Sequence, residues 1–259
     1  MAFVQTEVFT ILSLGFILGL RHALDADHLI AVSTIVSGRK GIFSSSLVGA
    51  MWGIGHTAAL LVIGLIVIAL QIQITERVAL AMEFGVAAML VILGLNLLWK
   101  LYNGEMIHVH VHEHHGHQHI HPHIHPFKTP HEHSSEPSHH ESTSSKFLQR
   151  LLSHVAKSKR SILIGMVHGM AGSAALMLIV LATIQSTTLA LLYIAIFGFG
   201  SIGGMMLMST VIGLPFMLTA DKSLTLNRIV RGIAGVTSVL FGLFLGWQIG
   251  VVEGLFIPR

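Results

Sequence analysis

The sequence predicts an all-α integral membrane protein, and three observations support this fold class. Hydrophobic residues make up 53% of the 259 residues and charged residues only 10%, too few polar residues to cover a soluble globule. Six stretches are long and apolar enough to cross the hydrocarbon core of a bilayer as helices. The two halves of the chain also share motifs at a nearly constant offset, which indicates a duplicated helical unit.

The six predicted spans cover most of the chain outside one polar segment. We place them at residues 6–36, 43–70, 79–101, 160–184, 187–214 and 229–252. The first is long for one helix and contains Arg21 to His28, so we expect a kinked, tilted or interrupted helix there. Splitting it would give a seventh span. Met1 to Gln5 lack the features of a signal peptide, so the first span is expected to stay in the membrane.

A histidine-rich segment, residues 102–159, separates the two halves. Residues 108–140 contain fourteen of the nineteen histidines, and Pro, Ser and Glu fill much of the rest. This composition predicts a hydrophilic loop that is disordered unless metal orders it. The pattern favours affinity for divalent metals, although the loop could also be a passive tether. The predicted organisation is therefore a first three-helix repeat at 1–101, the loop, and a second repeat at 160–259.

The duplication is visible in three matches that occur in the same order in both halves. Residues 19–24 align with residues 165–170 at an offset of 146, while 54–55 align with 202–203 and 91–99 with 239–247 at an offset of 148. Because each unit has an odd number of spans, the two copies must face opposite ways. This inverted repeat is a common design of secondary transporters and predicts a substrate site near the midplane, between the copies.

Lysine and arginine are concentrated in the connections on one side of the six-span arrangement. The rich side carries Arg39, Lys40, Lys146, Arg150, Lys157, Lys159, Lys222 and Arg228, and the other side shows only Arg77 and Arg259. Because cytoplasmic connections are usually the more basic ones, the histidine-rich loop is expected in the cytoplasm and both termini outside it. The sequence thus predicts a multi-pass protein of a prokaryotic cytoplasmic membrane.

One short segment of the first span holds a cluster of ionisable residues. Each such residue near the bilayer centre costs about 2.5–3.5 kcal/mol on insertion scales, so the cluster predicts a function. An interhelical ion pair between Arg21 and Asp25 is the alternative interpretation for those two residues. Imidazole with a few carboxylates suits Ni²⁺, Co²⁺ or Zn²⁺, whereas Mg²⁺ and Ca²⁺ prefer oxygen alone. The cluster comprises Arg21, His22, Asp25, Asp27 and His28.

The local geometry of this cluster depends on whether the helix is continuous. On a straight α-helix Asp25 neighbours both His22 and His28, but the two histidines point well apart. A 3₁₀ or broken segment would align all three. Asp27 is expected on another face, where it would orient His28 rather than bind metal directly.

Two further histidines lie in apolar stretches. His56 follows glycines that would allow another helix to approach closely, and it is interpreted as a ligand or as a packing histidine. His168 occupies the position equivalent to His22 but has no accompanying carboxylates. It is therefore a ligand or a gate or packing residue.

The segment Arg21–Val32 resembles the signature of the nickel/cobalt transporter (NiCoT) family. Its pattern of His, four residues, Asp and His falls on His22, Asp27 and His28, and the family element Leu-Gly-His-Ser/Thr resembles Ile54–Thr57. The resemblance, which looks closest to shorter nickel permeases associated with urease genes, implies a secondary permease for Ni²⁺ or Co²⁺. It implies that these three residues and His56 select and pass the metal. We expect Arg21 and Thr57 to be supporting residues.

The leading functional hypothesis is metal uptake, with release toward the histidine-rich loop. Efflux, with the loop collecting excess metal, is the first alternative. An intramembrane metalloenzyme is the second, although the sequence has no His-Glu-x-x-His pair. A metal-sensing receptor would need an output domain. No prosthetic cofactor and no nucleic acid are expected as partners; the expected partners are a divalent metal ion and the bilayer, with a possible link to urease or hydrogenase maturation.

Overall fold

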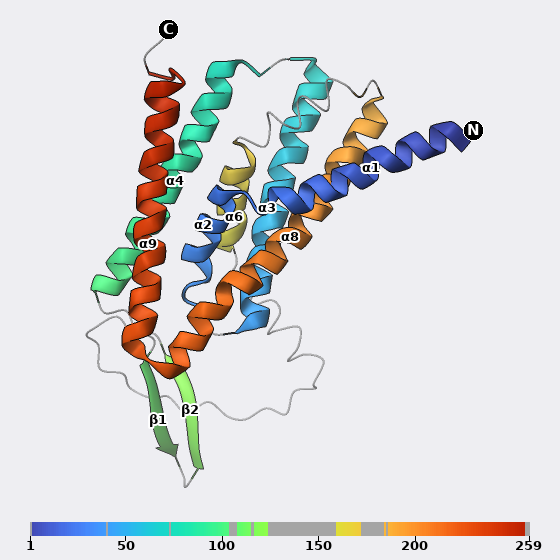
Figure 1. The fold of residues 1–259 in the computed structure, drawn as a ribbon. Helices are drawn as coiled ribbons and strands as arrows, with labels where there is room; N and C mark the ends of the chain where they lie inside the picture. The colour runs from blue at the N-terminus through green and yellow to red at the C-terminus, as the bar shows by residue number, and fades with distance from the viewer. Residues whose placement is uncertain are drawn as a thin grey trace.

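The computed structural model describes residues 2–39, 41–72, 74–103, 108–114, 117–123, 159–171, 184 and 186–256. This part is helical apart from one two-stranded hairpin (Figure 1). The helices are α1 (Ala2–His22), α2 (Ala26–Val36), α3 (Ile42–Leu70), α4 (Glu76–Tyr102), α6 (Lys159–Gly169), α8 (Thr187–Lys222) and α9 (Leu224–Trp247), which continues into a π-helical turn, η1 (Gln248–Val252).

Four helices are long and apolar enough to cross a membrane, and a bent helix pair makes up to five within the described residues. The four are Ile42–Leu70, Glu76–Tyr102, Thr187–Ala220 and Leu224–Val252, close to the predicted spans 43–70, 79–101, 187–214 and 229–252. The predicted span 160–184 begins as α6, but this helix ends at Gly169, and residues 172–183 lie outside the described part. The prediction of a multi-span helical membrane protein is confirmed.

The first predicted span is interrupted, as expected from its polar cluster. α1 and α2 meet at a break of three residues with a bend of 55°. Within the break, the backbone N–H of Leu24 donates to Arg21 O at 2.9 Å and that of Asp25 to His22 O at 3.1 Å. These are the i to i+3 bonds of a tight 3₁₀-type turn. The chain therefore changes direction without leaving these backbone donors unpaired.

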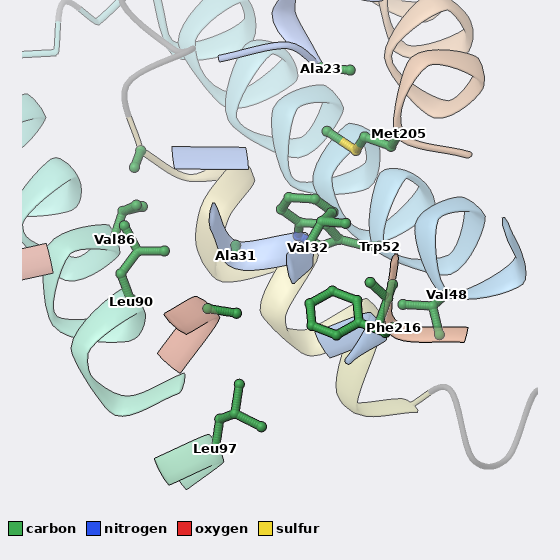
Figure 2. Packing of buried hydrophobic residues seen from close by; sticks show 13 residues of the cluster. Ala23, Ala31, Val32, Val48, Trp52, Val86, Leu90, Leu97, Met205 and Phe216 are labelled. Carbon is green, nitrogen blue, oxygen red and sulfur yellow. The ribbon is translucent and has the colours of Figure 1, made fainter. Parts of the chain in front are cut away.

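Packing places α2 inside the bundle. α3 contacts both α6 and α8, α4 contacts α9, and α1 lies across α8, while α2 contacts α4, α8 and α9. Figure 2 shows Ala31 and Val32 of α2 among core residues of α3 and α4. The buried cluster there includes Val48, Trp52, Val86, Leu90, Leu97, Met205 and Phe216. A short helix carrying polar residues is thereby held between the long spans.

The α4–α9 interface repeats the same contacts from both sides. A Cβ added at Gly94 would lie 2.6 Å from Gly235 O, and one added at Gly242 would lie 2.8 Å from Ala87 O. The hydroxyl of Ser238 donates to Leu90 O at 2.8 Å. An offset of 148 residues converts Gly94 into Gly242 and Ala87 into Gly235, so the second contact is the first with the two halves exchanged, and Leu90 and Ser238 are themselves 148 residues apart. The offset found between the halves of the sequence therefore also relates positions that face each other in space.

The hairpin lies in the histidine-rich segment, where the sequence predicted no regular structure. Strand β1 (His108–His114) pairs antiparallel with β2 (His117–His123), and His108 is opposite His123. Histidine alternates with Val or Ile along part of both strands, and alternation with period two is the pattern of a strand. The assignment of 102–159 as a separate cytoplasmic loop stays a prediction.

Replacing Gly94 with alanine should destabilise the protein, because the new methyl group would collide with the backbone of α9. Overpacking of this kind costs about 1–3 kcal/mol. Gly85 on the same helix is a matched control, since a Cβ there meets nothing within 4 Å. Thermal unfolding in detergent should show a lower midpoint for Gly94→Ala than for Gly85→Ala. Equal midpoints would contradict the close approach of α4 and α9.

Candidate metal site

Four histidines from four different helices meet inside the bundle. They are His22 at the end of α1, His28 in the first turn of α2, His56 in α3 and His168 in the last turn of α6. The ring centroid of His28 lies 4.4 Å from that of His22, 5.3 Å from that of His56 and 4.1 Å from that of His168. His28, His56 and His168 are almost fully buried. His28 is thus the centre of the group.

The break between α1 and α2 creates this arrangement. Asp25 precedes α2 with an extended backbone, but its side chain makes no capping bond to the helix. Its carboxylate instead lies 2.7 Å from Nδ1 of His22. The next acidic residue, Asp27, lies in the first turn of α2, where a negative charge is favourable because free backbone N–H groups point outward. Each carboxylate is therefore directed at a histidine by local backbone geometry.

Asp27 connects two of the histidines. One carboxylate oxygen accepts from the backbone N–H of His28 at 2.9 Å and lies 3.0 Å from Nδ1 of the same residue. The other oxygen lies 3.0 Å from Nε2 of His168. α2 and α6 are thus joined through one side chain in an otherwise apolar interior.

Small residues allow α6 to approach α3 at the histidines. A Cβ at Gly165 would collide with the backbone carbonyl of Trp52, and one at Gly169 with that of His56. Such close helix contacts are typical of membrane bundles, where small residues let backbones pack together. The glycine adjacent to His168 therefore helps to hold that imidazole beside His56.

Several ring nitrogens in this cluster have no hydrogen-bond partner among the described residues. They include Nε2 of His28, Nδ1 of His56 and Nδ1 of His168, all buried. Buried polar atoms are nearly always paired. When a carboxylate accepts the Nδ1–H of an imidazole, the lone pair on Nε2 is free to bind a metal. The Asp27 carboxylate lies beside Nδ1 of His28 in this way, and the Asp25 carboxylate lies beside Nδ1 of His22.

Two overlapping groups of side chains have the geometry to hold a metal ion. The first is His22, His28 and His56, and the second is Asp27, His28 and His168. In each group the possible ligand atoms lie within 4.8 Å of one another. Nε2 of His22 and Nε2 of His56 are only 3.3 Å apart. An ion of borderline softness would suit these nitrogen-rich groups.

The structure brings together the six residues that we expected to be ligands, although they are not equally buried. They are His22, Asp25, Asp27, His28, His56 and His168. Asp25 is exposed and contacts His22. The alternative ion pair between Arg21 and Asp25 is not formed in the described part of the chain. Thr57 is buried. Its hydroxyl donates to Gly198 O at 3.3 Å, a hydrogen bond that connects α3 to α8 and involves none of the histidines.

Sequence reasoning missed two aromatic residues that enclose the histidines. Trp52 is fully buried, and its ring centroid lies 5.3 Å from that of His28 and 5.4 Å from that of His168. The ring centroid of Phe197, in α8, lies 5.6 Å from that of His22. The position of Trp52, one helical turn before His56, was a signal that could have identified it. Phe197 has no comparable signal.

These features define a multi-span membrane protein with a buried imidazole and carboxylate cluster at a helix break. A family model described as high-affinity nickel-transport protein (NicO) matches residues 8–250. The chain therefore belongs to this family of nickel-transport proteins, and the prediction made from the signature around His22 is confirmed. Membership in a transporter family is also consistent with the expectation that the chain is not an enzyme.

Two relatives are similar to this chain over different lengths. The urease accessory protein UreH of Bacillus sp. (strain TB-90) is 36% identical over 252 residues, which cover 97% of each chain. The chloroplast protein FOR GROWTH AND FERTILITY 2 of Arabidopsis thaliana is 41% identical over 68 residues, 26% of this chain and 18% of that protein. None of the solved structures matches the chain.

Proposed function

We propose that this protein carries Ni²⁺, or Co²⁺, into the cell across the cytoplasmic membrane, through the cluster around His28. The observation that carries the proposal is the convergence of buried imidazoles with unpaired nitrogens at the break between α1 and α2. Ionisable residues inside a membrane bundle commonly mark an ion pathway. Family membership supports nickel as the cargo.

His22, His28 and His56 act as the primary ligands in this proposal. A bare divalent ion is costly in a low-dielectric interior unless nearby charge offsets it. Asp25 and Asp27 provide two negative charges through their contacts with His22 and His28. Three neutral imidazoles and two carboxylates thus balance the charge of one Ni²⁺. The nitrogen-rich set also disfavours Mg²⁺ and Ca²⁺, which prefer oxygen ligands.

His168 provides a second position for the ion. Because His28 belongs to both metal groups, an ion could exchange His22 and His56 for Asp27 and His168 while keeping one ligand. The rings of His22 and His168 both lie within 4.4 Å of His28, at 4.4 and 4.1 Å. This arrangement favours movement in small steps, without full release of the ion into an apolar environment.

Alternating access would come from two inverted repeats. The matching contacts of α4 and α9 at an offset of 148 residues support such a relationship. So does the packing of α1 on α8 and of α6 on α3, because α1 and α6 carry the equivalent residues His22 and His168. Rocking of one repeat against the other around His28 would then expose the ion to each side in turn.

Orientation follows from the basic end of the bundle. We place the ends of α2 and α4 and the starts of α6 and α9 in the cytoplasm, since Arg39, Lys100, Lys159 and Arg231 lie there. The histidine-rich segment would then bind metal on arrival, and the binding should weaken below about pH 6.5, where imidazole becomes protonated. The name of the relative UreH favours urease maturation as one use of the metal.

Transport should depend on His28 more than on histidines of the loop. In a nickel-transport-deficient bacterial host, ⁶³Ni²⁺ accumulation should rise with the parent chain and return to background with His28→Ala. Asp27→Asn should retain some transport with about 10- to 100-fold weaker apparent affinity, because it disturbs the orientation of His28. His154→Ala, in the predicted loop, is the matched control and should accumulate nickel like the parent.

Two other outcomes of this experiment would contradict the proposal. A fall in cellular nickel on expression of the parent would indicate efflux. Unchanged accumulation with verified membrane expression would contradict nickel transport altogether.

Metal binding at the cluster should be visible in the fluorescence of Trp52, because its ring lies beside His28 and His168. A Trp99→Phe/Trp247→Phe variant keeps Trp52 as its single tryptophan, and Ni²⁺ should quench its emission. The added change His28→Ala should abolish the saturable quenching, while a Trp52→Phe variant reports only on the exposed Trp99 and Trp247. Equal quenching with and without His28 would place the metal elsewhere, for example on the histidine-rich segment.

A further inference from the structure

A cavity lies at the basic end of the bundle, away from the histidine cluster. It has a volume of about 680 Å³, within the range of about 300–1,000 Å³ that is usual for small-ligand sites. The ends of α2 and α4 and the starts of α6 and α9 surround it. Thr34 lies six residues after His28 on α2, so the cavity begins about 9 Å further along that helix.

Positive charge dominates the wall of this cavity. Of the described residues that line it, five are lysine or arginine and none is aspartate or glutamate. None of the five forms a salt bridge within the described residues. They come from separate parts of the chain, namely Arg39, Lys100, Lys159, Arg160 and Arg231. Five cations that face one cavity repel one another, and an anion would relieve that repulsion.

Two of these cations are partly withdrawn from water. Nε of Arg231 is buried and has no hydrogen-bond partner among the described residues. An unpaired donor on a charged group is costly, more so than on a neutral one. Arg39, in the connection between α2 and α3, is half-buried, and burial lowers the pKa of its guanidinium. Basic residues that act only as topology signals can remain in water, whereas these residues line one cavity.

The remaining walls also suit a phosphate-bearing ligand. Ser37 and Ser161 supply hydroxyl oxygens, while Ile35, Leu93, Leu97 and Ile164 add apolar surface. A cavity with cations at the membrane boundary and apolar residues beside them matches the two parts of a lipid.

We propose that this cavity binds the phosphate group of an anionic ligand, with an anionic phospholipid headgroup as the favoured source. Basic pockets between helices at the cytoplasmic side of a membrane are suited to such headgroups. Arg39 and Arg231 are the principal contacts, because they are the partly buried arginines and an arginine can donate two parallel bonds to a phosphate. The site is separate from the metal ligands, so it does not depend on the proposed nickel transport.

The test uses the full chain, purified and delipidated in detergent. Phosphatidylglycerol or cardiolipin should raise the midpoint of thermal unfolding and stay bound in native mass spectrometry, whereas phosphatidylcholine should not. Arg39→Gln and Arg231→Gln should each weaken the apparent lipid affinity about fivefold or more, since a charge near the membrane surface is worth about 1 kcal/mol. Arg77→Gln removes one exposed charge at the opposite end of α4 and should behave like the parent.

Inorganic phosphate, added alone and in competition with the anionic lipid, shows whether the bound phosphate group comes from a lipid or from solution. If phosphate alone gives the full stabilisation and anionic lipid adds none, the cavity binds soluble phosphate and the lipid assignment is wrong. The proposal as a whole fails if phosphatidylcholine stabilises the parent as well as phosphatidylglycerol does, or if Arg77→Gln loses as much affinity as Arg231→Gln. Should the glutamine variants not fold, the lipid comparison in the parent and an Arg231→Lys variant, which keeps the charge, still decide it.

Discussion

The high cost of burying polar groups inside a membrane bundle is the constraint on which the rest of this structure depends. Three buried imidazoles, with a fourth imidazole and a carboxylate partly buried beside them, can be accommodated there only if they satisfy one another or a metal ion. On a continuous helix His22 and His28 would point about 120° apart. The three-residue break between α1 and α2 brings their ring centroids to 4.4 Å and directs Asp25 and Asp27 at their nitrogens. Glycines in α6 then bring His168 to the same point.

Much of this arrangement could be predicted from the sequence, because the signals are local. Spans follow from runs of apolar residues, and the break follows from the charge density of Arg21 to His28. Contacts between distant segments could not be predicted in the same way. Arg21 and Asp25 have the spacing of a helical ion pair, yet the turn gives the Asp25 carboxylate to His22. The enclosure by Trp52 and Phe197 depends on how α3 and α8 cross.

Duplication explains how the helices around the site are arranged, but it explains only some of the candidate ligands. The two copies provide equivalent histidines, His22 and His168, and equivalent contacts between α4 and α9. At an offset of 146, however, Asp25 corresponds to Ala171 and Asp27 to Ser173. The carboxylates therefore come from one copy alone, and Asp27 reaches His168 of the other. A symmetric scaffold thus holds an asymmetric charge distribution, and the two groups of candidate ligands around His28 are unequal.

The electrostatics of the histidine cluster and of the basic cavity are linked, because both involve α2 and α6. The candidate metal site is negative through Asp25 and Asp27, whereas five described lysine and arginine residues line the cavity about two turns away. At an effective dielectric constant of about 20, each unpaired cation roughly 10–15 Å from a divalent ion opposes it by about 2–3 kcal/mol. An ion leaving His28 toward the basic end would meet that opposition in full. A phosphate bound in the cavity would offset it, so under the proposed transport the anion would ease movement of the ion toward the basic end.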